Sequence, residues 1–320
     1  MITEQMRAAF EAQMAAPANI AAITQAASHA RAGNTDAAIT VAASLAQAAF
    51  TAPENIAAIY DATACGWLAR PTPGPDIPGS TKPAEPLTTN FWDIFWELAE
   101  DSTKGMGAGE ITTRTAGLAA RLAPSFQPRA AAASAAYPGA TTAAANGFPA
   151  RIRMQNLQMA PVGSLGHEFY RLLVDNNYDI EVLDRDTLNL QSLIAPLDYL
   201  NARMLQTHDL WHITAGYHTT KLHEIALSAF QLSQFGHNYS AMFLALVVTT
   251  AAHTAPAAIP LLLETICTAW QHGRATPPMM LIPWEQAWAE PTEVLRVRYG
   301  ITPYASPYPA NIIELFEGAA

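Results

Sequence analysis

The sequence predicts an all-α protein: a multi-helix globular domain with an apolar groove, a helical N-terminal extension and inserts rich in proline and alanine. Through residues 151–320, apolar residues recur at the three- and four-residue spacing of helices that bury one face. No alternating apolar and polar runs separated by hairpin turns, the pattern of strands, are visible. Hydrophobic residues make up 50% of the 320 positions and charged residues 14%, which is typical of a folded protein and not of a disordered one.

Two similar alanine-rich segments lie near the N-terminus, APANIAAITQA from Ala16 and APENIAAIYDA from Ala52. Isoleucines at positions i and i+3 give each segment the apolar stripe of an amphipathic helix. Two copies are too few for a solenoid, which needs several stacked repeats. We therefore expect two helices that pack antiparallel within an N-terminal region of alanine-rich helices, residues 1–70.

The middle of the chain divides by composition. Residues 71–90 are rich in proline and glycine, which excludes regular structure and predicts an extended linker or a surface loop. Residues 91–150 start with a helical stretch, FWDIFWELAED, and continue into a segment rich in alanine, glycine and proline over residues 123–150, which we expect to be mobile. From residue 151 the composition is mixed again, so we assign the functional domain to residues 151–320.

Helices of this last domain have recognisable starts and stops. Ser164 is placed to cap a helix whose apolar residues form one stripe. A long helical pattern over residues 184–216 breaks near Pro196, and Gly216 is a suitable stop because glycine adopts the left-handed conformation that ends helices.

The longest apolar stretch covers residues 241–270 and raises the question of a membrane span. His253, Pro256 and Pro260 interrupt it near its middle. We therefore expect two apolar helices that meet at a proline turn. Such a pair either lies in the protein core or rests on a bilayer surface.

Charge and cysteine content exclude several classes of function. The formal net charge is −10 and no basic cluster occurs, so nucleic acid is excluded as a partner. Cys65 and Cys267 are the only cysteines and lie far apart, so neither a disulfide framework nor a CxxC metal site is predicted. The N-terminal stretch MITEQMRAAFEAQMAAP is unlike a secretory or transit peptide, which favours the cytoplasm of a prokaryote.

A histidine cluster, QTHDLWHITAGYHTTKLHE at residues 206–224, holds four of the nine histidines. His208 and His212 are four residues apart, so on a helix both rings stand on one face, the arrangement of zinc-binding histidine pairs. Asp209 follows the first histidine and can reach the same ion or orient a histidine.

Glu224 lies further along and joins this site only if the chain bends. On an uninterrupted helix it would point about 120° away from His212. Gly216 supplies a bend, and Thr219 or Thr220 can cap a new helix that begins near Lys221. The spacing is thus consistent with two helices that meet at a site made of two histidines, an aspartate and a glutamate.

The plainer interpretation is a solvated or hydrogen-bonded histidine pair on a helix surface. Four suitable donors favour a metal. Two imidazoles with one or two carboxylates suit Zn²⁺, Mn²⁺ or Fe²⁺, and spacing does not choose among these ions. We interpret His218 and His223 as solvated groups or as partners of the metal ligands.

The motif resembles the H-D-x-x-H-x11-E signature of the coenzyme Q (ubiquinone) biosynthesis protein 4 family, with HDLWH followed after eleven residues by Glu224. Upstream, APVGSLGHEFYRLL resembles a family segment, with Ser164 in place of the usual threonine. Downstream, LHEIALSAFQLSQFG resembles the family's next helix, with His223 in place of the usual glycine. PWEQAWAEPTEVLRVRYGI, residues 283–301, resembles the closing pattern, so the resemblance covers about residues 155–301.

The resemblance implies an all-helical protein that binds a divalent metal, usually zinc, with iron and manganese as alternatives. It implies that His208, Asp209, His212 and Glu224 are both the metal ligands and the catalytic residues. The implied enzyme is a carboxy-lyase of ubiquinone biosynthesis, which removes the carboxyl at ring carbon one of a polyprenylated 4-hydroxybenzoate-type precursor. An oxidative version also stays open, and it requires a redox-active metal or dioxygen because Zn²⁺ cannot supply electrons.

Partners and location follow from the same resemblance. The implied partners are the polyprenylated quinone precursor, other enzymes of ubiquinone biosynthesis and a membrane surface, and a homodimer is compatible with the sequence. The implied location is the bacterial cytoplasm, with peripheral association at the inner membrane.

A polyprenyl tail requires a long apolar groove, which residues 242–248 and 258–266 and the leucines of 187–199 could line. Ordinary core is the alternative for each of these residues. Two other functions stay open. One is a non-catalytic scaffold that binds a prenyl lipid and gathers partner enzymes, and the other is a different metal-assisted lyase or hydratase reaction on an apolar small molecule.

Overall fold

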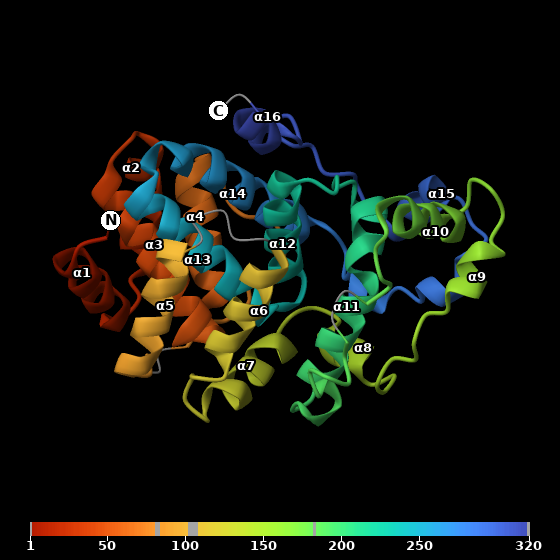
Figure 1. The fold of residues 1–320 in the computed structure, drawn as a ribbon, viewed down its shortest axis with the longest axis horizontal. Helices are drawn as coiled ribbons and strands as arrows, with labels where there is room; N and C mark the ends of the chain where they lie inside the picture. The colour runs from red at the N-terminus through yellow and green to blue at the C-terminus, as the bar shows by residue number, and fades with distance from the viewer. Residues whose placement is uncertain (1, 81–83, 102–107, 182–183, 319–320) are drawn as a thin grey trace.

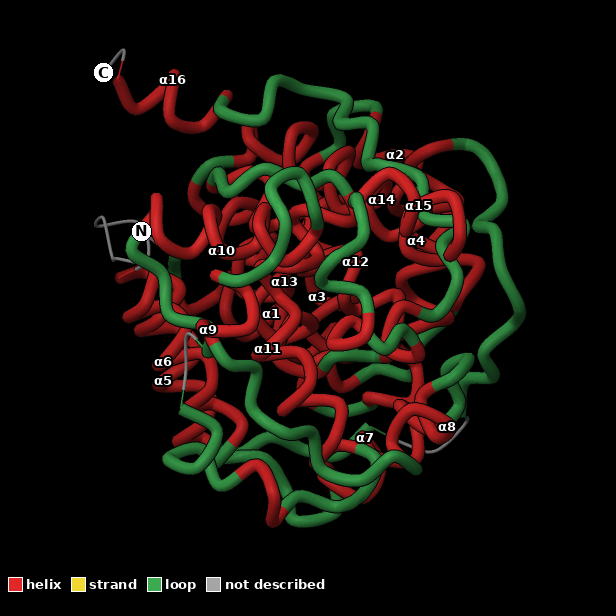
Figure 2. Tube along the Cα trace, turned by 90° about the vertical axis from the view of Figure 1, so that its right-hand side faces the viewer, coloured by secondary structure: helices red, strands yellow, loops and turns green. Residues whose placement is uncertain are grey.

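The computed structural model describes residues 2–80, 84–101, 108–181 and 184–318. Within these ranges all regular structure is helical and no strand occurs, which confirms the predicted all-α class (Figure 1 and Figure 2). The α-helices are α1 Glu4–Ala15, α2 Ile20–Arg31, α3 Thr35–Phe50, α4 Ile56–Leu68, α5 Thr89–Asp101, α6 Ala108–Ala119, α7 Phe126–Ala135, α8 Ala140–Ala144, α9 Met154–Gln158, α10 Leu165–Asn176, α11 Leu197–Ala215, α12 Lys221–Phe235, α13 Asn238–Thr254, α14 Ile259–Ala275, α15 Thr292–Tyr299 and α16 Ile312–Gly318. Short 3-10 helices lie between several of them: η1 Pro53–Asn55, η3 Leu190–Ser192, η4 Pro256–Ala258, η5 Met279–Leu281 and η6 Trp284–Gln286.

The two alanine-rich repeats form α2 and α4, which pack against each other as predicted. The contact is close because Gly66 has no side chain. A β-carbon at Gly66 would lie 2.0 Å from the carbonyl oxygen of Thr24. Gly66 is near the end of α4 and Thr24 is near the beginning of α2, as an antiparallel pair requires.

The N-terminal helices share one apolar core with the C-terminal helices α13 and α14, which lie among them in Figure 1. α3 contacts α13, and α4 contacts α14. Two indole hydrogen bonds join the second pair in both directions. Trp67 of α4 donates to Glu264 of α14 at 2.7 Å, and Trp270 of α14 donates to Asp61 of α4 at 2.7 Å.

The proline-rich segment after α4 is without helix over the residues described there, as predicted, but it is held against the bundle. Nη2 of Arg274 donates to the carbonyl of Pro75 at 2.5 Å, and the amide of Ser80 donates to Oδ1 of Asn55 at 2.7 Å. A β-carbon at Gly74 would lie 2.6 Å from the carbonyl oxygen of Arg274. The segment is therefore a strap along α4 and α14, and we call residues 70–80 and 84–88 the strap.

The alanine-rich stretch over residues 123–150 is not the loose insert predicted from its composition. It forms α7 and α8, and Phe126, Ala130 and Ala143 are buried. Arg129 of α7 pairs with Glu54 at 2.6 Å. Alanine favours helix and allows close packing, so a simple composition here gives short packed helices.

α13 and α14 confirm the predicted pair of apolar helices, which meet at the proline turn η4. No helix in the described ranges is long and apolar enough to cross a membrane. The groove predicted along residues 242–248 and 258–266 is not seen, because most of these side chains lie in the core against α3, α4 and α12. Ordinary core, the alternative interpretation, is correct for them.

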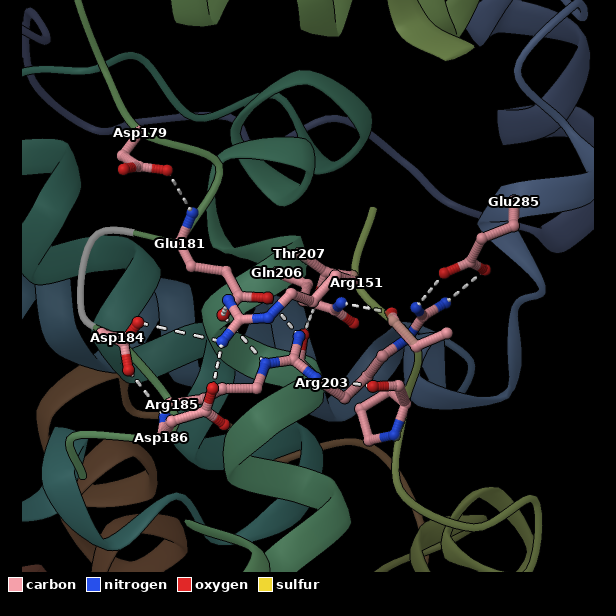
Figure 3. Close-up of polar contacts among 12 residues, drawn as sticks. Arg151, Asp179, Glu181, Asp184, Arg185, Asp186, Arg203, Gln206, Thr207 and Glu285 are labelled. Atoms are coloured by element: carbon pink, nitrogen blue, oxygen red, sulfur yellow. Dashed lines mark hydrogen bonds and ion pairs between the residues drawn. The ribbon is translucent and has the colours of Figure 1, made fainter. Parts of the chain in front are cut away.

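α11 begins directly after Pro196, as predicted, but most of the helix predicted over residues 184–195 is absent. Only the single turn η3 forms there, preceded by turns. Hydrogen bonds and ion pairs of charged and polar side chains hold the segment that precedes α11 in place, as Figure 3 shows. Arg185, 3% exposed, pairs with Glu181. The N-terminal half of α11 is tied by Arg203 to Glu285, and by Gln206, which donates at 2.6 Å to the backbone carbonyl of residue 150.

Candidate metal centre

Three of the four predicted ligands come together where α11 approaches the start of α12. His208 and His212 lie one turn apart in the C-terminal half of α11, and Glu224 lies in the first turn of α12. Gly216 ends α11 with a φ of 77°, which confirms the predicted bend. A β-carbon at Gly216 would lie 2.8 Å from Cβ of Pro303, so the turn requires glycine both for its conformation and for space.

α12 begins at Lys221, as predicted, but without the predicted threonine cap. Thr220 stands at the capping position, yet its Oγ1 donates to the carbonyl of Ala310 at 2.7 Å. The amide of Lys221 instead donates to Oε1 of Glu314 in α16 at 2.8 Å. A carboxylate from the C-terminal helix therefore occupies the positive end of the helix that carries Glu224.

The three residues have the spacing of a small-cation site. Their ligand atoms all lie within 4.8 Å of one another. Nε2 of His208 lies 3.2 Å from Oε2 of Glu224, and Nε2 of His212 lies 3.1 Å from Oε1. Two ligands about 2.1 Å from a tetrahedral zinc ion are roughly 3.4 Å apart, so these distances are close to those of a metal site.

Asp209 lies beside this group and is not part of it. Its side chain is on α11 and 6% exposed. Burial raises the pKa of Asp209, the positive charges of His208 and His212 oppose the rise, and the negative charge of Glu224 adds to it. The structure thus places the fourth predicted ligand within electrostatic reach of the other three.

The hydrogen bonding of His212 fits a metal ligand. Its Nδ1 lies 3.2 Å from the carbonyl oxygen of Tyr217, an acceptor, so Nδ1 carries the proton. Nε2 then presents a lone pair. This atom is buried and lies 3.1 Å from Oε1 of Glu224, without the geometry of a hydrogen bond. A cation between them would satisfy both, and a carbonyl that fixes the other ring nitrogen is usual for metal-bound histidines.

His208 and Glu224 polarise each other. Burial opposes a charge on His208, but the hydrogen bond and charge of Glu224, together with the charge of Asp209, outweigh it and raise the pKa of His208. Burial likewise opposes a charge on Glu224, but the two histidines outweigh it and lower its pKa well below the ordinary carboxyl range. Glu224 is therefore ionised and available as an anionic ligand.

The two remaining histidines of the cluster differ from each other. His218 is exposed, which confirms the interpretation as a solvated group. His223 is 2% exposed, so it is not a solvated group, and its role as a partner of the metal ligands stays a prediction. Its Nδ1 accepts a hydrogen bond from the amide of His218 at 2.8 Å, and the rings of Tyr217 and Tyr304 cover it. Burial, aided by the charges of His218 and His212, lowers the pKa of His223 to about 4.

Three further residues at the site were not predicted: Tyr178, Tyr217 and Gln231. Tyr178 is 41% exposed and so near Glu224 that this charge adds to burial in raising its pKa. Gln231 lies 2.8 Å from Nδ1 of His208. Gln231 follows Glu224 by two helical turns on the same face, a spacing that would have identified it. No comparable signal marks Tyr178, which lies outside both site helices.

Comparison with known proteins identifies the part of the chain that carries this site. Residues 149–305 match the family described as coenzyme Q (ubiquinone) biosynthesis protein Coq4. The chain is 31% identical over 155 residues to the mitochondrial ubiquinone biosynthesis protein COQ4 homolog of Mus musculus, covering 47% of this chain and 54% of that protein. It is 30% identical over 148 residues to the Homo sapiens homolog, covering 46% and 53%. The chain thus spans about half the length of the curated relatives it matches.

A solved structure supports the fold. The chain is similar to the crystal structure of a Nostoc punctiforme protein, provisionally described as a ubiquinone biosynthesis protein, with a TM-score of 0.50 and 23% identity. The similarity covers 66% of this chain and 97% of that one, and at this identity it concerns the fold alone. The matched residues of the family include all of α11 and α12, the two helices of the metal centre. Residues 149–305, which carry the candidate metal centre, are thus similar to the coenzyme Q (ubiquinone) biosynthesis protein 4 family.

Proposed function

We propose that this protein acts in ubiquinone biosynthesis as a metal-dependent carboxy-lyase. Its substrate would be a polyprenylated 4-hydroxybenzoate-type precursor, from which it removes the carboxyl at ring carbon one. The observation that carries the proposal is the cluster of His208, His212 and Glu224, in which Nε2 of His212 is buried without a hydrogen bond. The family match supports the pathway, because the cluster lies inside residues 149–305.

The three residues would hold one divalent ion, with Zn²⁺ preferred and Fe²⁺ or Mn²⁺ as alternatives. Asp209 would complete the ligand set or orient a histidine within it. A bound ion would supply a Lewis acid that polarises the carboxylate or phenolate oxygen of the ring.

The protein's own side chains would bind and orient the ring from one side. The His212 side chain is 1% exposed, whereas the Glu224 side chain is 42% exposed, so the cluster opens toward solvent at Glu224. Tyr178 lies near this opening. Loss of CO₂ leaves an electron pair on ring carbon one, which takes up a proton. Where Asp209 orients a histidine and does not ligate the ion, its buried carboxyl would hold that proton.

The polyprenyl tail of the substrate also determines where the protein acts. A polyprenyl chain resides in a membrane, so we propose that the protein binds the inner-membrane surface next to other enzymes of the pathway. Met159, Val162 and Val297 support this, because they are 76%, 87% and 84% exposed. They lie on or next to α9 and α15, at the end of the molecule opposite α1 (Figure 1).

The test is conversion of a prenylated 4-hydroxybenzoate by purified protein in liposomes, with Zn²⁺ or with Fe²⁺ and dioxygen. We expect release of CO₂ and formation of the decarboxylated phenol, and we expect His212→Gln to abolish both. A product with a hydroxyl at ring carbon one, formed only with iron and dioxygen, would identify the oxidative version. Tight lipid and metal binding without any CO₂ would contradict the enzyme and favour the scaffold.

A further inference from the structure

A chain of hydrogen bonds continues from His208 away from the metal cluster. Nε2 of Gln231 lies 2.8 Å from Nδ1 of His208. Oγ of Ser240 lies 3.4 Å from Oε1 of Gln231, and Nδ1 of His237 lies 2.9 Å from the same Oγ. Gln231 belongs to α12, while the other two residues lie at the start of α13. We call Gln231, Ser240 and His237 the histidine arm.

The hydrogen bonds of the histidine arm all run in one donor-to-acceptor direction in this structure, because an amide nitrogen can only donate. Gln231 donates to Nδ1 of His208, so a neutral His208 carries its proton on Nε2, the atom that faces Glu224. The hydroxyl of Ser240 donates to Oε1 of Gln231. This leaves the lone pairs of Oγ for His237, which therefore donates from Nδ1.

A metal bound by the cluster would require these hydrogen bonds to run in the opposite direction. His208 would ligate through Nε2, so its proton would move to Nδ1, and Nδ1 would then need an acceptor. In the arm, Oε1 of Gln231 supplies that acceptor once the amide turns over. The amide nitrogen would then face Ser240 and donate to Oγ, and the hydroxyl proton would point to Nδ1 of His237. His237 would keep a single proton, now on Nε2.

We propose that the histidine arm positions His208 for metal binding by selecting its tautomer, and that metal binding reverses every hydrogen bond in the arm. The proposal rests on the metal site of the proposed function. Burial supports it, because Gln231 is 3% exposed and Ser240 is 1% exposed. Water cannot readily replace either partner, so the two orientations of Gln231 impose opposite directions on the whole chain.

The test is nitrogen NMR of ¹⁵N-histidine protein with and without one equivalent of Zn²⁺, at a pH at which the nitrogen shifts of metal-free His208 show the neutral ring. Nitrogen shifts distinguish the two neutral tautomers, and the His237 signals are assigned by their loss in His237→Gln. We expect the proton of His237 on Nδ1 without zinc and on Nε2 with zinc. A loaded protein in which His237 keeps its Nδ1 proton would overturn the role of the arm.

Two variants test the hydrogen bonds of the arm one at a time. In Ser240→Ala, zinc should bind within about tenfold of wild type while His237 no longer responds to it, and Gln231→Met should weaken zinc binding by about 10- to 100-fold. Ser228→Ala, at a buried serine of α12 outside the arm, is the matched control for Ser240→Ala and should change neither property. A His237 response that persists in Ser240→Ala would also overturn the proposal, and this variant suffices if Gln231→Met does not fold.

Failure of the arm is distinguishable from failure of the proposed function. Zinc content is measured on each sample before the spectra. A wild-type protein that takes up no zinc would overturn the metal centre, and the arm with it. A wild-type protein that takes up zinc while His237 stays unchanged would overturn the arm and leave the metal centre standing.

Discussion

Glu224 is the residue on which the metal centre depends most, because its two oxygens contact both histidines. The lowered pKa of Glu224 keeps it ionised, and the same interaction raises the pKa of His208. In the absence of a metal, this pair holds the site together. In the proposed metal site the same atoms would be ligands, so a single carboxylate would serve both states.

Removing one ligand should remove the metal. Glu224→Gln and His212→Gln replace a ligand atom by a poor one, and each should lower the metal content of protein purified without added metal from about one equivalent to near zero. Elemental analysis measures this. Glu97→Gln, at an exposed glutamate of α5, is the matched control and should keep the metal. Full metal content in Glu224→Gln would remove this carboxylate from the site.

The metal-free site should make stability depend on pH. The folded pKa of His208 is raised above 6.5, so its contribution is fully present below about pH 6.5 and is lost as pH rises through the higher folded value. Thermal unfolding in a chelator should therefore show a falling midpoint above about pH 6.5, and His208→Gln should flatten this part of the curve. A wild-type midpoint that rises over this range would contradict the assignment.

At the scale of elements, the turn between α11 and α12 determines the site. Gly216 reverses the chain, and α16 caps the start of α12 through Glu314. Of these, the bend could be predicted, because Gly216 follows a helical pattern directly. The cap from α16 could not, because Glu314 lies far away in sequence and its contact is tertiary. The burial of His223 was unpredictable for the same reason: Tyr304 covers it from a distant segment.

Gly216→Ala should damage both fold and site. The φ of 77° is strained for alanine, and the new β-carbon would lie 2.8 Å from Cβ of Pro303. We expect a loss of roughly 1–3 kcal/mol in the free energy of unfolding, with weaker zinc binding, measured by urea unfolding and zinc titration. Gly117→Ala, in α6 with no atom within 4 Å of the added carbon, should be neutral or stabilising. Equal effects of the two substitutions would contradict this account of the turn.

At the scale of the whole molecule, the amino-acid composition of a segment predicted its structure less well than the spacing of its apolar residues did. The 3.6-residue pattern correctly predicted the helical class, because a buried helix face has to be apolar along its whole length. The α13–α14 pair was predicted from the prolines that interrupt a long apolar stretch. The alanine-rich stretch around Ala130 gave no such signal, since alanine suits both a packed helix and a loose insert. The groove expected along residues 242–248 proved to be core, because apolar residues alone do not reveal whether protein or lipid covers them.

Membrane binding should depend on one end of the molecule. Val162→Asp and Val297→Asp place a charge on the exposed apolar end near α9 and α15, and each should lower the fraction that sediments with anionic or neutral liposomes by several-fold, about 1 kcal/mol or more per substitution. Ile20→Asp, at an exposed position of α2 near the opposite end, should leave binding unchanged. Equal losses for all three variants would contradict a specific membrane-facing end.

The strap has a consequence for how the chain withstands proteolysis. Residues 2–68 are joined to α13 and α14 by the core and by the indole hydrogen bonds of Trp67 and Trp270, so the covalent link through the strap adds little to their association. A protease that cuts within the strap should therefore produce a nicked protein whose two fragments migrate together on a native gel and separate only in denaturant. Genes encoding the two pieces separately should then yield a reconstituted complex that binds zinc like the intact chain.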